Sequence, residues 1–195
     1  MNIRRGLPED SAEIAPLLLL AMEDIVYKFI GAESKKKALD FLETMIFQKG
    51  NQYSHENCWI IEDDIREENE SSRILGVSLV YEGAELNKLR LPVAFYIKEN
   101  FNRDFNPEDE TQPGEIYIDC VAVDPNSQGR GIGSMMFKFL IDYYVKKQKL
   151  TLGLLVDNDN PSAKKLYLKL GFKVVSQKSL VGKQMDHMQI EPSTI

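Results

Sequence analysis

The sequence is short of the residues on which many enzymes and metal-binding modules depend. It has two cysteines and two histidines in 195 residues, and none falls at a spacing typical of metal ligands. Cys58 and Cys120 lie in apolar, strand-like stretches and are expected to be reduced core residues. A catalytic cysteine would need a histidine nearby, whereas His55 and His187 belong to stretches without a recognisable motif. The sequence therefore predicts neither a metal site nor a cysteine nucleophile.

Long apolar runs and excess positive charge are also missing. No apolar run reaches the roughly 18–20 residues of a membrane span, and residues 14–20 follow acidic residues instead of the basic segment of a signal peptide. We therefore expect a cytoplasmic protein without a membrane partner. The net charge of −6 argues against nucleic acid as the main partner, because phosphate binding needs a basic face. It is compatible with a cationic acceptor such as an amine.

Length and hydrophobic spacing predict one domain, residues 1–195, that alternates helices with strands. The expected helices are residues 8–30 with a break near 20–23, residues 33–49, the run after residue 133, and residues 161–170. The expected strands are residues 2–5, 58–61, 73–81, 116–123, 150–156, 172–175 and 184–190. Residues 62–72 are polar and predict a hairpin loop. Asn160 suits the N-cap of the last helix and Gly171 its C-terminal end.

Residues 82–114 are the least readable part of the chain. Residues 86–101 are compatible with a short helix or with irregular turns around Pro92. Residues 102–114 are rich in Asn, Asp, Glu and Pro, which is typical of an exposed loop. A connection this long is either functional or disordered. An ordinary surface excursion and a wall of a substrate site are both open interpretations.

Residues 115–147 are the stretch around which the chain is organised. Residues 116–123 are mostly β-branched or aromatic, as expected of a largely buried strand. The loop that follows contains three alternating glycines, Gly129, Gly131 and Gly133. Apolar residues then return at helical spacing, with one predicted face formed by Ile132, Met135, Met136, Phe139, Leu140 and Tyr143. The order strand, glycine loop, helix is typical of a phosphate-binding unit.

The chemistry of the loop follows from its glycines. Without a Cβ, the backbone N–H groups can be approached closely by a ligand, and the first N–H groups of a helix are unpaired and lie at the positive end of its dipole. Arg130 would add a fixed positive charge, and Gln128 and Ser134 would add donors. A helix entry without a ligand is the alternative, but three glycines would then cost stability without a purpose. Residues 128–134 therefore favour a phosphate or diphosphate.

One fold that binds a diphosphate in this way is the dinucleotide-binding fold. Gly129, Gly131 and Ser134 nearly match its fingerprint, and Asp157 follows a second strand near the place of a ribose-binding acid. However, a serine replaces the third glycine, and residues 124–128 separate the strand from the first glycine. Too few residues follow Asp157 for the remaining strands and helices. A dinucleotide enzyme is kept as an alternative.

A second family matches two separate stretches. Residues 128–133, Gln-Gly-Arg-Gly-Ile-Gly, resemble the Q/R-x-x-G-x-G/A signature with which GNAT N-acetyltransferases hold the pyrophosphate of acetyl-CoA. Residues 160–172 are similar to the N-x-x-A-x-x-L-Y-x-x-x-G-F element of that family. The resemblance covers roughly residues 115–176. It implies an α/β fold with a mixed, mostly antiparallel central sheet of about seven strands flanked by helices.

The resemblance also implies a cosubstrate, acetyl-CoA, and no metal. The positions that match the family's cofactor-binding segments are Val121, Ala122, Val123, Gln128, Gly129, Arg130, Gly131, Ile132, Gly133, Ser134, Asn160 and Tyr167. In the family, a bulge in the strand leaves backbone groups free to pair with pantetheine, and residues 121–123 are the matching place. Their side chains are expected in the core with or without a cofactor. Asn160 is equally explained as an N-cap.

Acetyl transfer to an amine needs a general base for the ammonium. Period-two alternation places Glu115, Tyr117 and Asp119 on one face of the central strand. Some members of the family carry an acid near the position that is Tyr117 here, so a direct glutamate base is in doubt. Asp119 is nearer the thioester end and is the first candidate, with Glu115 the second. Burial would raise the pKa of Asp119, which suits a base, but a hydrogen-bonded structural acid is the alternative.

Tyr167 is the candidate general acid, because a phenol can pass a proton to the departing sulfur of CoA. Its spacing on the last helix also suits a core aromatic. The resulting hypothesis is an N-acetyltransferase that transfers acetyl from acetyl-CoA to a primary amine by direct attack in a ternary complex. A noncatalytic CoA-binding or regulatory module on the same fold is the alternative. The acceptor and the oligomeric state stay open, and the sheet edge near the C-terminus is where a second copy could pair as a homodimer.

Overall fold

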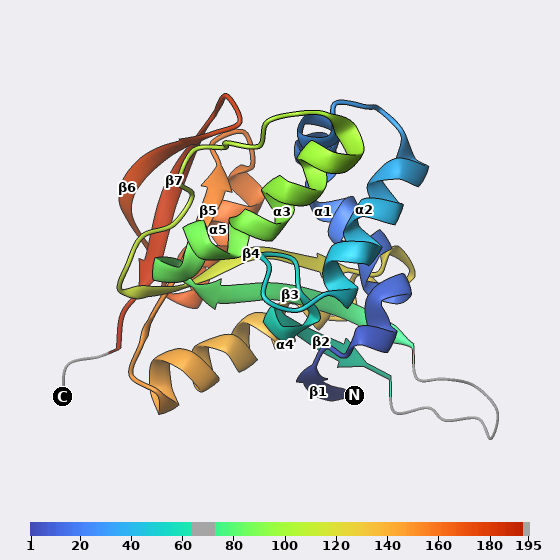
Figure 1. The fold of residues 1–195 in the computed structure, drawn as a ribbon. Helices are drawn as coiled ribbons and strands as arrows, with labels where there is room; N and C mark the ends of the chain where they lie inside the picture. Colours follow the sequence, from blue (N-terminus) through green and yellow to red (C-terminus); the bar gives the residue numbers. More distant parts are fainter. Residues whose placement is uncertain (64–72, 193–195) are drawn as a thin grey trace, which may run out of the picture. The chain divides into compact units, whose positions relative to one another are not determined.

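The computed structural model describes residues 1–63 and 73–192, so most of the predicted hairpin loop at residues 62–72 lies outside the described residues. Figure 1 draws the chain coloured along the sequence, with its helices and strands labelled. The chain divides into two compact units, each assembled from separate stretches. The first comprises Met1–Val80, Asn87–Phe105 and Cys120–Met136. The second comprises Tyr81–Leu86, Asn106–Asp119 and Phe137–Ile195. The central strand β4 (Glu115–Val123) contributes residues to both units.

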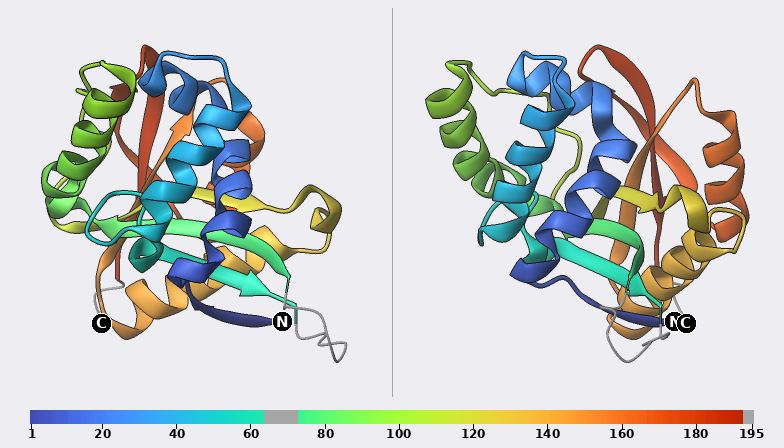
Figure 2. Two further views of the ribbon diagram at one scale, coloured as in Figure 1. Left: turned by 45° about the vertical axis from the view of Figure 1, so that its right-hand side comes forward. Right: turned by 90° about the vertical axis from the view of Figure 1, so that its right-hand side faces the viewer.

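The helices of the first unit follow the predicted apolar faces. Helix α1 (Ser11–Ile30) is interrupted at Met22, where φ is −137°, and ends at Gly31 in the left-handed region. Helix α2 (Lys35–Phe47) lies beside α1 in both views of Figure 2. Its buried residues are the five predicted from spacing, Ala38, Phe41, Leu42, Met45 and Ile46. Local periodicity was therefore sufficient to predict this pair of helices.

Helix α3 (Leu86–Phe101) is longer and more regular than the sequence predicts, with Pro92 inside it. Its buried residues are spaced as on one helical face, but one of them is the charged Arg90. The charge interrupts the apolar pattern that would otherwise indicate the helix. The interpretation of residues 86–101 as irregular turns is therefore wrong.

The strands of the first unit form an antiparallel meander. β1 (Asn2–Arg5) pairs with β2 (Cys58–Glu62), and β2 pairs with β3 (Ile74–Glu82), with a register shift opposite Ile61 and Glu62. The end of β4 joins this unit, since the N–H of Asp124 donates to the carbonyl of Leu75 at 2.9 Å. Cys58 is fully buried and Cys120 is half-buried, and both are free thiols.

The second unit contains the only parallel strand pair that the described residues show. β4 runs parallel to β5 (Thr151–Asp157), which pairs antiparallel with β7 (Lys183–Ile190), and β7 pairs antiparallel with β6 (Lys173–Leu180). Helix α5 (Pro161–Leu170) has Asn160 at its N-cap and Gly171 at its C-terminus, as predicted. None of its residues is fully buried, so the predicted buried stripe with Tyr167 is half-buried.

The hydrogen-bonded order of the strands is β1-β2-β3-β4-β5-β7-β6. The predicted fold, a mostly antiparallel sheet of seven strands with helices, is thereby confirmed. The dinucleotide-binding alternative is wrong, because that fold requires a mostly parallel sheet. Among residues 1–63 and 73–192, none of the helices combines the length and apolar character that crossing a bilayer requires.

Helix α4 (Ile132–Leu140) continues into a π-helical segment, Ile141–Lys147. Its buried face is rotated relative to the predicted one: Phe137 is 3% exposed, whereas Met135 is 37% exposed. Seven residues of π-helix are unusual, because this geometry mostly occurs as single turns and often at functional sites. Met135 and Phe137 both precede the π-helical segment, and the spacing of the apolar residues of α4 is compatible with either face being buried.

Candidate active site

The glycine loop lies in the first unit and opens α4. Gly129 and Gly131 have φ values of 77° and 79°, a conformation that other residues rarely adopt, and a Cβ added at either would meet no heavy atom within 4 Å. The helical hydrogen bonds begin with the N–H of Met135, which donates to the carbonyl of Gly131 at 2.9 Å. The N–H groups of residues 132–134 therefore have no acceptor within the helix. The loop presents backbone donors beside open space.

A buried carboxylate anchors the start of this loop. Asp124 is 7% exposed and accepts a 2.7 Å hydrogen bond from the Arg73 guanidinium and a 3.1 Å bond from the Ser127 hydroxyl. The guanidinium of Arg130, by contrast, is 46% exposed and lies 4.0 Å from Asp63. Gln128 is exposed and Ser134 is half-buried. The loop is thus fixed at its base and carries an accessible positive charge at its centre.

Val121, Ala122 and Val123 belong to the same unit as the loop. The side chain of Val123 reaches within 3.7 Å of the Cβ position of Gly133, so this end of β4 packs directly under the helix entry. Upstream of it, the alternation of buried and open residues breaks, since Asp119, Cys120 and Val121 are half-buried in succession. This run overlaps at Val121 with residues 121–123, where the family resemblance places backbone groups available to a ligand.

Asp119 lies in the second unit, in a cluster that the sequence does not predict. Its Oδ2 atom is 2.9 Å from the hydroxyl of Tyr81, which also lies 3.3 Å from Oε1 of Glu110. Tyr81 and Glu110 are each 5% exposed. Burial, together with the negative charges of Asp119 and Glu110, raises the pKa of Tyr81 well above its usual range. Tyr81 therefore stays protonated and donates its single proton within the cluster.

Glu115 is the centre of a second cluster in the same unit. It is 2% exposed, and its carboxylate accepts hydrogen bonds from His187 Nε2 at 2.8 Å, Gln189 Nε2 at 2.6 Å and Thr111 Oγ1 at 2.7 Å. Gly153 on β5 makes room for it, because a Cβ there would overlap the carboxylate. Burial raises the pKa of Glu115, and these hydrogen bonds more than offset it, so the pKa lies below its ordinary value. Glu115 is therefore ionised and fully engaged in hydrogen bonds.

Residues 102–114 form the predicted, mostly exposed loop, but two of its residues are buried. Glu110 and Thr111, at its C-terminal end, are 5% and 4% exposed. The Lys178 ammonium on β6 donates to the carbonyl of Thr111 at 3.0 Å, and Glu108 accepts from the N–H of Val181 at 3.0 Å. The segment is held against the β6–β7 hairpin, and it carries Glu110 to Tyr81.

Tyr167 and Asn160 lie on α5 in the second unit. The ring of Tyr167 packs at 5.2 Å from Phe137 and 6.1 Å from Phe172, measured between centroids. Asn160 caps the helix, since its Oδ1 accepts from the N–H of Ala163 at 3.1 Å. Tyr167 therefore packs against aromatic neighbours, and Asn160 is an N-cap, as the structural interpretations of both residues predict. These contacts leave their suggested roles toward a cofactor as predictions.

The candidate site residues divide between the two units. The loop at residues 128–134 and Val121–Val123 fall in one unit, and Asp119, Glu115, Asn160 and Tyr167 in the other. Sequence reasoning missed three residues, Tyr81, Glu110 and His187. No local motif marks them. Tyr81 and His187 depend on the register of β3, β4 and β7, and Glu110 depends on the path of the loop before β4. Within residues 1–63 and 73–192, no group of three or more His, Cys, Asp or Glu side chains is arranged to hold a metal.

Comparisons with solved structures show the same architecture. An acetyltransferase crystal structure has a TM-score of 0.79 and 28% sequence identity, with 99% of this chain and 100% of that chain covered. An N-acetyltransferase from Staphylococcus aureus Mu50 has a TM-score of 0.81 at 21% identity, covering 97% of this chain and 100% of the other. The second likeness is one of fold alone.

Sequence comparisons add the family. Curated relatives include the mycothiol acetyltransferases of Tsukamurella paurometabola, 41% identical over 59 residues, and of Renibacterium salmoninarum, 42% identical over 59 residues. These matches cover 30% of this chain and 20% and 17% of the relatives, so the chain spans a fifth or less of their length. The sequence model of the acetyltransferase (GNAT) family matches residues 36–172. This match covers most of the chain, which therefore belongs to the GNAT family of acetyltransferases.

Proposed function

We propose that the protein is an acetyl-CoA-dependent N-acetyltransferase that acts on a primary amine of a small molecule or protein by direct attack in a ternary complex. The observation that supports this most is the open glycine loop. Gly129 and Gly131 have left-handed backbone conformations, yet nothing packs where their side chains would be. Gly50 is equally open, but the two loop glycines lie at the start of α4, beside N–H groups that have no acceptor within the helix.

The loop fits the diphosphate of acetyl-CoA in charge as well as in shape. The unpaired N–H groups at the start of α4 and the accessible guanidinium of Arg130 are the donors that phosphate oxygens require. In this proposal residues 128–134 hold the diphosphate, Val121–Val123 pair with the pantetheine arm, and Asn160 adds a hydrogen bond. Acetyl-CoA supplies the activated acetyl group.

Asp119 is the proposed general base, which takes a proton from the ammonium of the acceptor. The Tyr81 hydroxyl orients its carboxylate from 2.9 Å. Tyr167 is proposed to donate a proton to the leaving thiolate. Glu115 was the second candidate base, but its ionised, fully engaged carboxylate suits a positioning role, because it holds Thr111 and with it the adjacent Glu110. We therefore propose Glu115 as a positioning residue.

Direct attack is favoured over a covalent cysteine intermediate. Of the two thiols, Cys58 is fully buried and donates to the carbonyl of Ser54 at 3.6 Å, and Cys120 is half-buried on β4. Neither has the exposed, electropositive setting that activates a thiolate. The expected cytoplasmic location stays a prediction, as does pairing of a second copy at β6, the edge strand.

A noncatalytic CoA-binding module is the second candidate, because the loop alone would serve it. The two are separated by incubating the full chain with acetyl-CoA and a panel of primary amines, and by following thiol release and the mass of the amine. We expect thiol release that depends on at least one amine and yields an equal amount of N-acetyl product. Saturable acetyl-CoA binding without amine-dependent thiol release for diamines, amino acids, aminoglycosides and lysine peptides would favour the noncatalytic module.

A further inference from the structure

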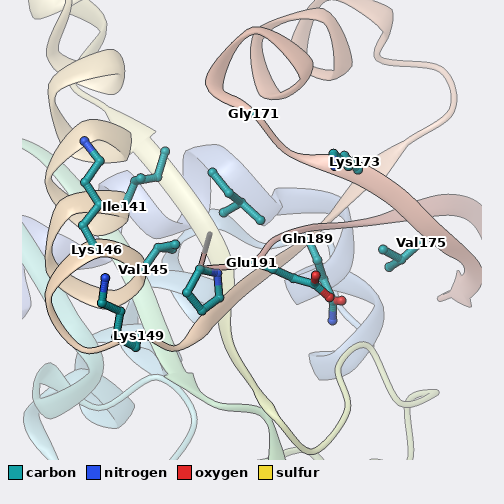
Figure 3. Close-up of a pocket in the computed structure, with 11 residues that line it drawn as sticks. Ile141, Val145, Lys146, Lys149, Gly171, Lys173, Val175, Gln189 and Glu191 are labelled. Carbon is teal, nitrogen blue, oxygen red and sulfur yellow. The ribbon is translucent and has the colours of Figure 1, made fainter. Parts of the chain in front are cut away.

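The second unit contains a cavity of about 790 Å³ that none of the roles above uses (Figure 3). One wall is the π-helical segment Ile141–Lys147 with the turn after it, and the facing wall is Gly171 with the start of β6. Gln189 and Glu191 lie between them. The volume falls within the roughly 300–1,000 Å³ of typical small-molecule sites.

Five lining side chains are apolar. They are Ile141, Val145, Val175, Ile190 and Pro192. Ile141 and Val145 are buried, whereas Val175 on the edge strand is 49% exposed. Covering such an exposed apolar side chain with the hydrocarbon of a ligand removes apolar surface from water, which is favourable. The lining therefore favours a ligand with an apolar body.

The charges of the lining are mostly positive. Three ammonium groups, Lys146, Lys149 and Lys173, face one carboxylate, Glu191. Lys146 is paired with Asp142 at 2.6 Å. Within the described part of the chain, neither Lys149 nor Lys173 has an ion-pair or hydrogen-bond partner for its side chain. Two unpaired cations at one cavity are notable in a protein with a net charge of −6, and they favour an anionic head group.

The backbone around the cavity is also unusual. The π-helical wall ends with the N–H of Leu150 donating to the carbonyl of Tyr144 at 3.0 Å, and Lys149 has φ of 61°. Non-glycine residues rarely adopt such a conformation, and π-helical turns are frequent at functional sites. Lys149, at the end of this helical segment, lines the cavity.

We propose that this cavity binds a small organic anion with an apolar body, of the chemical class of a medium-chain carboxylate. The carboxylate pairs with Lys149 on the π-helical side, Lys173 on the facing wall adds positive charge, and the hydrocarbon packs on Ile141, Val175 and Ile190. Gln189 links the site to the buried cluster, because it lines the cavity and donates to Glu115 at 2.6 Å. The site does not depend on acetyl transfer, so its test is independent of the proposed function.

The test is calorimetric titration of the full chain with three matched probes. Octanoate has the anionic head and the hydrocarbon, octylammonium has the same hydrocarbon with the opposite charge, and acetate has the head alone. We expect saturable binding of octanoate at one site, with octylammonium and acetate at least about tenfold weaker. No binding of octanoate, or equal binding of octanoate and octylammonium, would overturn the proposal.

Variants test whether octanoate binds in this cavity. Lys149→Glu/Lys173→Glu should weaken octanoate at least about tenfold, and Val175→Trp should weaken it by filling the cavity. Lys35→Glu/Lys37→Glu on α2 makes the same change in net charge away from the cavity and should leave the affinity unchanged. Undiminished binding by the first variant, or equal loss in both double variants, would contradict the site. Circular dichroism shows whether each variant folds. If Lys149→Glu/Lys173→Glu does not fold, Lys149→Gln/Lys173→Gln is measured in its place.

Discussion

The Tyr81 hydroxyl, near the end of β3, donates a 2.9 Å hydrogen bond to Oδ2 of Asp119, in the middle of β4. Burial and two neighbouring carboxylates keep the pKa of Tyr81 well above its usual range, so the phenol stays protonated at neutral pH. The bond therefore orients Asp119 and stabilises its charged form. Asp119, the candidate base predicted from the sequence, therefore has a defined hydrogen-bond donor.

Removing that donor should impair turnover. Tyr81→Phe keeps the ring and its contact with Tyr117, whose centroid lies 5.7 Å away, but removes the hydrogen bond. We expect kcat to fall roughly tenfold, as for loss of a hydrogen bond to a charged group. The acid limb of the rate profile should move to higher pH, because the charged carboxylate loses its donor. Tyr27→Phe, at a half-buried tyrosine whose hydroxyl is bonded to Glu23 on the same helix, is the control and should change neither quantity.

Asp119→Asn tests the base itself. Loss of general-base catalysis costs about 100-fold to 10,000-fold in kcat, while the dissociation constant of acetyl-CoA should stay within about twofold of the wild-type value. Steady-state kinetics and calorimetry measure the two. Asp40→Asn on α2, where the carboxylate is an exposed partner of Lys36, is the matched control. A fully active Asp119→Asn enzyme would leave Asp119 as a structural acid.

Tyr167→Phe tests the proposed general acid. The substitution retains the packing on Phe137 and Phe172 and removes only the hydroxyl. We expect kcat to fall at least about tenfold with little change in acetyl-CoA affinity. The loss should be smaller with an acetyl thioester whose leaving thiol is more acidic, because that thiol needs less protonation. An unchanged kcat would place Tyr167 among the packing residues.

The Glu115 cluster predicts a pH-dependent stability. Its lowered pKa means that the charged form stabilises the fold at pH values above about 4.3, the ordinary glutamate value. This contribution is lost as the pH falls through the lower pKa of the folded state. Glu115→Gln should lower the free energy of unfolding at pH 7 by roughly 1–3 kcal/mol, because donors then face an amide N–H.

Urea unfolding at pH 7 and below pH 4 measures the difference between wild type and Glu115→Gln. The difference should narrow at the acidic end, where the wild-type carboxyl also becomes neutral. Glu43→Gln on the exposed face of α2 is the control and should show no difference at either pH. A gap of the same size at both pH values would show that charge is not what the cluster contributes.

Local patterns predicted the parts of the molecule that depend on neighbours in sequence. The buried face of α2, the interruption of α1 at Met22, the caps of α5 and the glycine loop all follow from residues within one or two helical turns. Helix α3 was missed because the buried Arg90 interrupts its apolar face. The buried face of α4 was misjudged because apolar residues occupy both possible faces of the helix, so that spacing alone does not choose between Met135 and Phe137.

The polar clusters could not be predicted in this way. Tyr81 and Asp119 are 38 residues apart in sequence, and Glu115 and His187 are 72 residues apart. Their meeting depends on strand order and register, which a single sequence leaves undetermined. The sequence nevertheless identified one member of each pair, because a carboxylate in an apolar strand needs a partner wherever the strand is placed.

The proposal that the glycine loop binds acetyl-CoA is tested most directly by calorimetric titration of acetyl-CoA into the wild-type chain and into two glycine variants. Gly131→Asp puts a side chain and a negative charge into the open loop, whereas Gly50→Asp makes the same change at φ of 71°, where a Cβ also meets nothing within 4 Å. Both variants carry the same backbone strain of about 1–2 kcal/mol. We predict at least about 100-fold weaker binding for Gly131→Asp and wild-type affinity for Gly50→Asp. Undiminished acetyl-CoA binding by Gly131→Asp would contradict the assignment of the loop and the function proposed from it.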